Sequence, residues 1–221
     1  MTKQCKHLKT KESEQVIILL KKYGDLFDGT LFMWNTTPMY LELRNDAKPV
    51  CLKTYPVPRV YEAVFRKEFE RRVNLGVLEE ANNSKWGAPS FYQTKAKTNC
   101  VRFLSDFLNL NRQLKCKPYP MPKIREMLLN IEGFKYASSL YLNMVPYHIR
   151  LREYASNLCT IILTWIKYRY KRLLTRVSNS PDIFQDKMNA IFCCFRFIGA
   201  YIDALLIITK GDWSDHLEKL E

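Results

Sequence analysis

The chain has 221 residues, 47% of them hydrophobic, and a formal net charge of +13. This length can bury one sizeable core or two small lobes, and the excess of Lys and Arg indicates a polyanionic partner. The longest nearly uninterrupted apolar run, 197–208, is too short to cross a bilayer, and no signal peptide is visible at the start, so neither a membrane protein nor a secreted one is expected.

The first half of the chain predicts two helices and a hairpin. An amphipathic helix is expected over 12–23 and a stronger helix over 61–75, where three apolar residues recur every four positions. These residues are Phe65, Phe69 and Val73. The basic residues of the second helix fall largely off this stripe and are expected to be solvated; they are Arg66, Lys67, Arg71 and Arg72. Segment 92–103 predicts a hairpin with a polar tip.

The second half predicts further alternation of helices and strands. Pro122 opens a helix that ends at Gly133, and 134–144 predicts a strand. A hairpin is expected over 157–173. Ser180 is expected to cap the next helix, with Pro181 as its first residue.

Residues 195–209 predict a strand, a tight turn at Asp203-Ala204 and a second strand. The run is apolar and rich in β-branched residues, interrupted only by Arg196 and by this dipeptide. On the pattern alone, Asp203 can be an ordinary turn residue whose carboxylate bonds nearby backbone. It can equally be one carboxylate of a metal centre.

Segment 149–179 predicts a basic surface. Seven Lys or Arg face a single acid there, Glu153, and Tyr168 and Tyr170 alternate with the cations, a mixture typical of surfaces that hold phosphates and stack bases. A solvated basic face is the alternative. The cations are Arg150, Arg152, Lys167, Arg169, Lys171, Arg172 and Arg176.

The seven cysteines include no C-x-x-C pair, and the three histidines are far apart, so a zinc site is not expected. The cysteines are expected to be reduced, mostly buried thiols of an intracellular protein. The adjacent pair Cys193-Cys194 is interpreted as packing.

Six sequence blocks, in order along nearly the whole chain, resemble the reverse transcriptase of Gypsy-type LTR retrotransposons. Three of them are Ser84-Lys85-Trp86-Gly87-Ala88-Pro89-Ser90-Phe91, Arg102-Phe103-Leu104-Ser105-Asp106-Phe107 with Leu110-Asn111, and Ser178-Asn179-Ser180-Pro181-Asp182-Ile183-Phe184-Gln185. The other three are 75–78, 119–124 and the hairpin from Tyr201.

The resemblance implies an α+β fold with the fingers and palm subdomains of a right-hand polymerase, the thumb being absent. The fingers would take about 45–117 and 149–179, and the palm, incomplete, about 118–148 and 180–221. Residues 1–44 are similar to the region that connects protease and polymerase in these polyproteins. A degenerate, truncated copy is expected.

The family polymerises nucleotides with two divalent ions, Mg²⁺ or Mn²⁺, held by aspartates at three positions. Here these positions are Tyr141, Asp203 and Ala204, so a single carboxylate is retained. We expect metal binding to be weak or absent and template-primed nucleotidyl transfer to be lost.

The resemblance also implies binding residues. The nucleotide-binding positions are Lys95, Arg102, Asp106, Pro146, Thr175 and Arg176, and the template-binding positions are Trp86, Pro181 and Gln185. Pro146 stands at the position of an aromatic gate against ribonucleotides, and Arg176 at the position of a glycine. Leu108 stands at the position of an arginine. Pro146 and Arg176 are expected to threaten the local backbone.

The partners implied are an RNA template, a DNA primer, a dNTP and other polyprotein domains such as protease, RNase H and integrase, in a cytoplasmic particle or the nucleus and without a membrane. Whether the chain is an enzyme stays open. It can be an RNA-directed DNA polymerase by descent with a broken centre, a non-catalytic nucleic-acid-binding or interaction protein derived from a retroelement, or a decayed copy without function.

Overall fold

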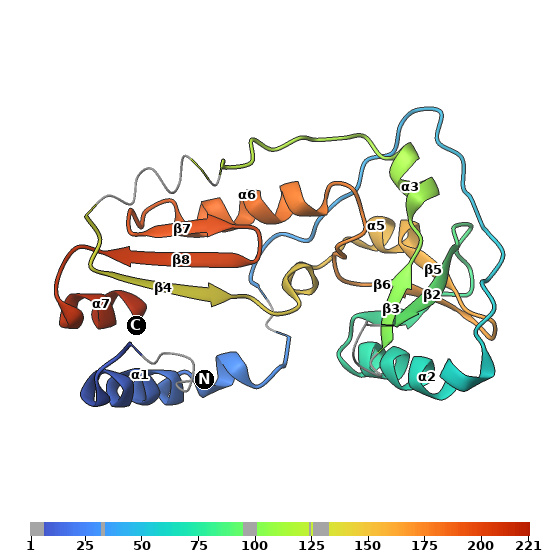
Figure 1. Ribbon diagram of the computed structural model, residues 1–221. Helices are drawn as coiled ribbons and strands as arrows, with labels where there is room; N and C mark the ends of the chain where they lie inside the picture. The colour runs from blue at the N-terminus through green and yellow to red at the C-terminus, as the bar shows by residue number, and fades with distance from the viewer. Residues whose placement is uncertain (1–6, 32–33, 95–100, 124, 126–132) are drawn as a thin grey trace. The chain divides into compact units, whose positions relative to one another are not determined.

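The computed structural model describes the chain except residues 1–6, 32–33, 95–100, 124 and 126–132 (Figure 1). The chain divides into two compact units. Unit 1 comprises 1–30, 119–143 and 184–221, and unit 2 comprises 31–118 and 144–183. Within the described ranges, no helix combines the length and apolar character that crossing a membrane requires.

Unit 2 is built on a five-stranded sheet in the order β1-β6-β5-β2-β3. All neighbouring strands are antiparallel except β2 and β5, which are parallel. The strands are β1 (Leu78–Glu80), β2 (Ala88–Thr94), β3 (Val101–Ser105), β5 (Thr160–Ile162) and β6 (Lys167–Tyr170). The helices are α2 (Arg59–Asn74), α3 (Leu108–Gln113), the 3₁₀ turn η3 (Val145–His148) and α5 (Glu153–Leu158).

Helix α2 packs its apolar stripe on β3. Phe65 stacks on Phe103 with ring centroids 5.0 Å apart, and both side chains are buried. Arg72 does not follow the prediction of a solvated charge, because only 9% of it is exposed. Its guanidinium lies 4.8 Å from the centre of the Phe103 ring and bonds Glu68 Oε1 at 2.6 Å, so the charge is buried with both an aromatic and an acidic partner.

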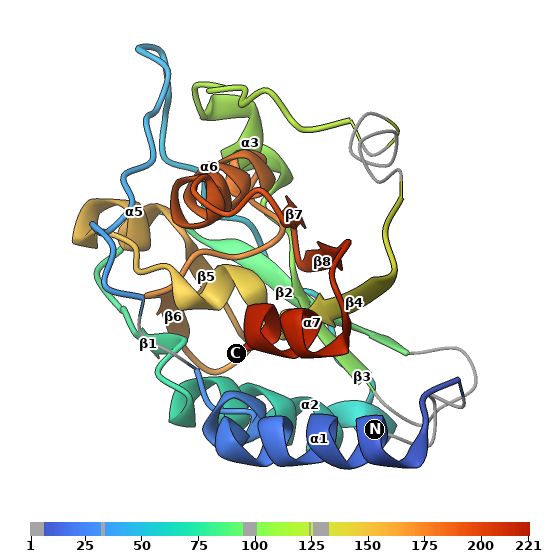
Figure 2. The ribbon, with the colours of Figure 1, turned by 90° about the vertical axis from the view of Figure 1, so that its left-hand side faces the viewer.

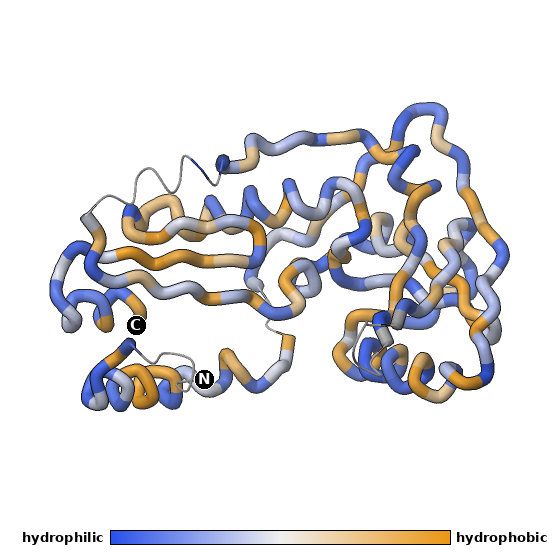
Figure 3. Tube along the Cα trace, viewed as in Figure 1, coloured by the Kyte–Doolittle hydropathy of each residue, from blue (hydrophilic) through white to orange (hydrophobic). Residues whose placement is uncertain are grey.

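Unit 1 is built on a three-stranded antiparallel sheet in the order β4-β8-β7. The strands are β4 (Tyr136–Tyr141), β7 (Ile198–Tyr201) and β8 (Ala204–Thr209). The helices are α1 (Thr10–Lys22), the 3₁₀ turn η2 (Gly24–Phe27), α6 (Ser180–Phe192), whose first turn belongs to unit 2, and α7 (Trp213–Leu220). Figure 3 shows β8 apolar along its length, as expected for the central strand.

Both ends of the chain take part in unit 1. Helices α1 and α7 lie side by side (Figure 2). The indole Nε1 of Trp213 on α7 donates to Gln15 Oε1 on α1 at 2.7 Å, and Lys22 pairs with Glu221. The predicted lead-in over 1–44 is thus divided: residues 1–30 cluster with unit 1 and residues 31–44 with unit 2.

Helix α7 is anchored to the sheet by His216, of which 2% is exposed. Its two ring nitrogens lie 2.9 Å from hydroxyl oxygens, Nε2 from Ser138 Oγ on β4 and Nδ1 from Thr209 Oγ1 on β8. The ring also stacks on Tyr136. The histidine thereby ties two strands to the last helix.

Unit 1 is expected to lose stability in mild acid because of His216. Burial lowers the pKa of this histidine, with nearby Lys219 acting in the same direction and Asp215 opposing it. The unfolded chain therefore binds more protons as pH falls below the ordinary histidine value of about 6.5, and the free energy of unfolding falls with it. Thermal melts between neutral and mildly acidic pH measure how stability depends on pH. In a His216→Gln variant, which cannot titrate, the melting temperature should change less with pH. An equal change in both chains would show that other groups cause the pH dependence.

The cysteines are mostly not buried. Cys51, Cys116, Cys193 and Cys194 are exposed, and Cys159 is buried, where desolvation raises the pKa of its thiol. The prediction of buried thiols is therefore wrong for four of the five described cysteines. The other two, Cys5 and Cys100, lie outside the described residues.

Candidate functional site

The β7–β8 hairpin turns one residue earlier than predicted. Its two-residue turn is Ile202-Asp203, and Ala204 is already the first residue of β8. Ile202 adopts a left-handed φ of 49°, which is unusual for a β-branched residue. Asp203 is exposed, and its carbonyl accepts a hydrogen bond from the Leu142 amide at 2.8 Å. The tip of the hairpin is therefore tied to the end of β4.

Gln185 holds this turn from inside unit 1. The side chain is fully buried, and its Oε1 accepts the Ile202 amide at 2.7 Å. Its Nε2 donates to Ala200 O and Asn189 Oδ1, each at 2.9 Å. Two of these bonds, to Ala200 and Ile202, connect α6 to the hairpin, so Gln185 stabilises the unusual backbone of Ile202.

Replacing Gln185 by Leu is expected to destabilise unit 1. The substitution leaves the Ile202 amide and the Ala200 carbonyl without this partner, and an unsatisfied buried polar group costs about 1–3 kcal/mol. Chemical denaturation followed by circular dichroism measures the loss. Asn189→Ala is the control, because it removes the bond to Gln185 and the bond to the Tyr119 hydroxyl but leaves the turn amide paired. Tyr119→Phe measures the second of these bonds by itself, and a loss in Asn189→Ala as large as in Gln185→Leu after that correction would contradict the assignment.

Two of the three predicted metal positions, Tyr141 and Ala204, lie in one row across the sheet, and the third, Asp203, lies in the adjoining turn. Tyr141 on β4 lies directly opposite Ala204 on β8, which lies opposite Tyr201 on β7. Paired residues on neighbouring strands project to the same face. Tyr141 is 77% exposed, and its side chain offers a phenol in place of a carboxylate. Asp203 is the one carboxylate retained among the three predicted positions.

This donor set does not fit a pair of divalent ions. Two ions about 3.5–4 Å apart need at least two converging acidic side chains, and Tyr141 and Ala204 supply none. In the part of the chain that the structure describes, no group of three or more His, Cys, Asp or Glu side chains gathers into a metal cluster.

Unit 2 contains an open groove with a volume of about 800 Å³. Its lining brings together aromatic, acidic and basic side chains from distant parts of the chain. They include Tyr55, Phe91, Asp106, Leu108, Asn111 and Arg176. Asp106 and Arg176 were predicted as nucleotide-binding positions. Tyr55, Phe91 and Asn111 were not predicted as site residues, and nothing in the local sequence separates the two aromatics from core residues.

Asp106 organises one wall of the groove. Its Oδ1 accepts the Leu108 amide at 3.0 Å, at the start of α3, and its Oδ2 accepts the Tyr55 hydroxyl at 3.2 Å. The hydrogen bond to this carboxylate raises the pKa of Tyr55, so the phenol stays a donor. Both carboxylate oxygens of Asp106 are thus occupied by hydrogen bonds within the protein. The bond to the Tyr55 hydroxyl holds the edge of that ring beside the groove.

Arg176 supplies the positive charge of the groove. Asn111 holds its loop by donating to Arg176 O at 2.8 Å and accepting the Ser178 amide at 3.0 Å. The side chain is exposed, and within the described ranges its guanidinium forms no ion pair. Among described non-glycine residues, positive φ occurs only at Met144 and Ile202, so Arg176 does not occupy a left-handed conformation.

The other predicted positions are scattered. Arg102 on β3 and Thr175 are exposed, as is Pro181 in the first turn of α6. Pro146 lies in the first turn of η3, where proline is well accepted, and Lys95 lies outside the described residues. Ser180 is the first helical residue rather than the cap, and its hydroxyl donates to Leu174 O.

Two predicted template contacts have inward-facing side chains. Trp86 is 8% exposed, in the core of unit 2, and Gln185 is fully buried in unit 1. Their contacts with a template stay predictions, whereas their roles in packing and in holding the hairpin are evident from the structure.

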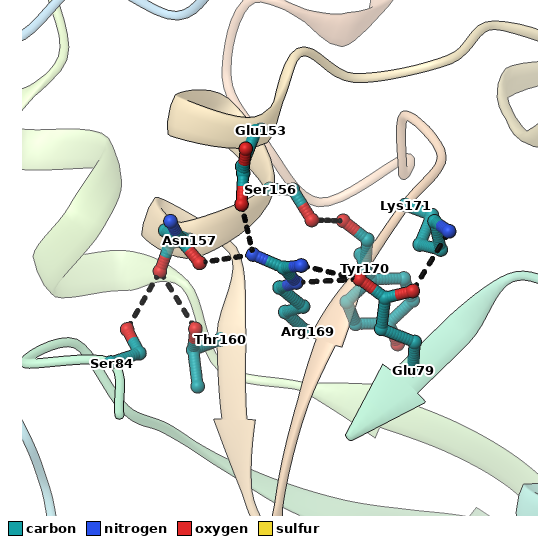
Figure 4. A network of polar contacts seen from close by, with 9 residues as sticks. All are labelled: Glu79, Ser84, Glu153, Ser156, Asn157, Thr160, Arg169, Tyr170 and Lys171. Carbon is teal, nitrogen blue, oxygen red and sulfur yellow. Dashed lines mark hydrogen bonds and ion pairs between the residues drawn. The ribbon is translucent and has the colours of Figure 1, made fainter. Parts of the chain in front are cut away.

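Two of the seven cations predicted in segment 149–179, Arg169 and Lys171, form ion pairs inside unit 2 (Figure 4). Arg169 bonds Glu79 Oε1 through Nε at 2.8 Å, and its Nη1 bonds Asn157 Oδ1 at 2.6 Å. Lys171 Nζ lies 2.8 Å from Glu79 Oε2, and these bonds lower the pKa of Glu79. Tyr170 is buried, with its hydroxyl 3.1 Å from Ser105 Oγ. Arg169 and Lys171 therefore link β6 and the residue after it to Glu79 on β1.

Comparison with known proteins shows relatives among viral and transposon polyproteins. The chain is 28% identical over 181 residues to a polyprotein of Cassava vein mosaic virus, covering 77% of this chain and 27% of the relative. It is 24% identical over 222 residues to the retrovirus-related Pol polyprotein of the Drosophila melanogaster transposon gypsy, covering 96% and 21%. The chain thus spans about a quarter of these relatives. No protein-family model matches it.

The fold matches solved structures of the prototype foamy virus protease–reverse transcriptase. One such structure superposes with a TM-score of 0.85 at 19% identity, covering 96% of this chain and 29% of the other. A foamy viral protease–reverse transcriptase in complex with an RNA/DNA hybrid superposes equally well, at 0.85 and 18% identity with the same coverage. The chain has the α+β polymerase fold of these enzymes. Its sequence is homologous to part of the polyproteins of viruses and retrotransposons, including the Pol polyprotein of gypsy.

Proposed function

We propose that this domain binds an RNA–DNA template–primer without extending it. The observation that carries the proposal is the pair Tyr141–Ala204, where the register puts a phenol opposite a methyl group next to the single carboxylate of Asp203. Reverse-transcriptase-like domains generally use divalent metals. Removing even about 5 kcal/mol of transition-state stabilisation slows a reaction by roughly 10³–10⁴.

The two units correspond in this proposal to the polymerase subdomains. Unit 2, at 31–118 and 144–183, takes the part of the fingers, and the 119–143 and 184–221 segments of unit 1 take the part of the palm. The fingers would contact nucleic acid mainly through phosphate charge, which needs no catalytic metal. Binding can therefore persist where catalysis is lost.

Three observations support nucleic-acid binding. The chain has a net charge of +13, and its groove in unit 2 combines the exposed Arg176 with the rings of Tyr55 and Phe91. Aromatic rings and unpaired cations together suit a nucleic-acid strand. The foamy viral enzyme with the same fold has been solved with an RNA/DNA hybrid and with double-stranded DNA. RNA template and DNA primer are the proposed partners, with dNTP and the protease, RNase H and integrase domains of a longer polyprotein as further ones.

The test pairs a binding assay with a catalytic one. Fluorescence anisotropy of a labelled RNA–DNA hybrid is expected to show binding at low ionic strength that weakens steeply as salt rises, because phosphate contacts release counterions. Primer extension on a homopolymer template is expected to give no product with Mg²⁺ or Mn²⁺. Extension by the unaltered chain would overturn the catalytic half of the proposal, and absence of binding at low salt would overturn the other half.

A further inference from the structure

Cys193 and Cys194 lie together on the surface of unit 1, in the turn that joins α6 to β7 (Figure 1). Helix α6 ends at Phe192, and the Cys193 amide still donates to Asn189 O at 2.8 Å. Both cysteines are exposed, and their sulfur atoms are 3.7 Å apart. Packing therefore does not account for this pair, contrary to the interpretation from the sequence.

The spacing of the two sulfur atoms suits one metal ion. In a tetrahedral site with Zn–S bonds of about 2.3 Å, two thiolates lie roughly 3.8 Å apart. The observed 3.7 Å nearly equals this value, so both sulfur atoms can bind one ion without a shift of the backbone. A disulfide needs a separation of about 2.05 Å and would require the turn to rearrange.

We propose that Cys193 and Cys194 form an open two-thiolate site for one thiophilic divalent cation of the Zn²⁺ class. Each thiol releases its proton to solvent and each sulfur forms one bond to the cation, displacing two of its waters; nothing is oxidised or reduced. Water or an external donor completes the shell, because no third His, Cys, Asp or Glu joins the pair into a cluster among the described residues.

This site is separate from the polymerase chemistry. Thiolates select soft or borderline ions, whereas Mg²⁺ and Mn²⁺ prefer oxygen ligands such as the carboxylate of Asp203. Ion binding at the turn is therefore independent of whether the hairpin binds metal and of whether the domain binds nucleic acid.

Titration of the full, reduced chain with Cd²⁺ tests the site, since Cd²⁺–thiolate bonds absorb in the ultraviolet and report how many sulfur atoms each ion binds. The expected result is one ion per chain held by two thiolates and displaced by Zn²⁺. Cys193→Ser and Cys194→Ser should each weaken binding about 100-fold, because the second bond of a chelate forms at high effective concentration. Cys51→Ser and Cys116→Ser, which remove other exposed thiols, should leave the affinity unchanged.

A second measurement needs no variant. Bound Cd²⁺ should protect Cys193 and Cys194 of the unaltered chain from alkylation, mapped by mass spectrometry, while Cys51 and Cys116 react at their usual rate. Unprotected Cys193 and Cys194, a single thiolate per ion, or affinity unchanged in Cys193→Ser would overturn the proposal.

Discussion

A chain carrying Tyr141→Asp and Ala204→Asp is expected to bind Mn²⁺ at the hairpin, where the unaltered chain should bind it weakly or not at all. The register pairs these two positions across β4 and β8, and the Cβ atoms of directly paired residues lie about 4.5–5.5 Å apart. Two new carboxylates would therefore converge beside Asp203. Electron paramagnetic resonance of free Mn²⁺ measures the binding directly. Primer extension reports whether the polymerisation rate rises by roughly 10³–10⁴ over that of the unaltered chain.

The single variants are the controls for this repair. Tyr141→Asp and Ala204→Asp alone each leave one of the paired positions without a carboxylate, so each should bind Mn²⁺ less well than the double variant. Tyr141 is 77% exposed, so its replacement removes little packing, although like charges across strands lower stability and a melt should accompany the titration. Equal Mn²⁺ binding by the unaltered and repaired chains would show that another set of ligands holds the ion.

The turn at the hairpin shows where sequence reasoning succeeds and stops. The β-branched run predicts two strands correctly, because that composition suits a buried strand. The turn itself is displaced by one residue because Ile202 takes a left-handed φ of 49°. Isoleucine rarely adopts a left-handed φ. The conformation persists here because the buried Gln185 side chain accepts a hydrogen bond from the Ile202 amide.

Charged residues were the least predictable from sequence. The period of the second helix correctly locates Phe65 and Phe69 in the core, yet it assigns Arg72 to solvent. Arg72 on α2 is buried against the ring of Phe103 on β3, and the two residues meet only because α2 packs on β3. In the same way, Arg169 finds Glu79 only because β6 pairs with β1. Counting charges along a segment of sequence cannot identify ion-pair partners that strand pairing brings together.

The sequence predicts no groove; it marks only two of the residues that line it. The resemblance marks Asp106 and Arg176, but the aromatic lining comes from Tyr55, outside the named strands, and from Phe91 on β2. The short helix α3, which carries Leu108 and Asn111, has six residues and too few turns to show a period. Sequence therefore indicates which positions resemble a site, and the fold decides which side chains share its walls.

Replacing Arg176 by Ala is expected to weaken binding of an RNA–DNA hybrid and to make the plot of log affinity against log salt shallower by about 0.9, the value for one lost phosphate contact. The side chain is exposed and lines the groove, so the change should not affect folding. Arg66→Ala is the matched control, because Arg66 already pairs with Glu62 and lies over the Trp165 ring. A similar change of slope in that variant would indicate general charge rather than the groove.

A complementary substitution separates the groove from the arginine itself. Leu108 is 54% exposed and lines the same groove, so Leu108→Arg in the Arg176→Ala chain returns one cation to the lining from α3. If phosphate binds in the groove, this chain should regain most of the lost salt dependence, because counterion release depends on how many phosphates are neutralised. If the slope stays shallow while the chain still melts normally, the phosphate contact belongs to the loop held by Asn111, and the aromatic lining of Tyr55 and Phe91 has no part in binding the strand.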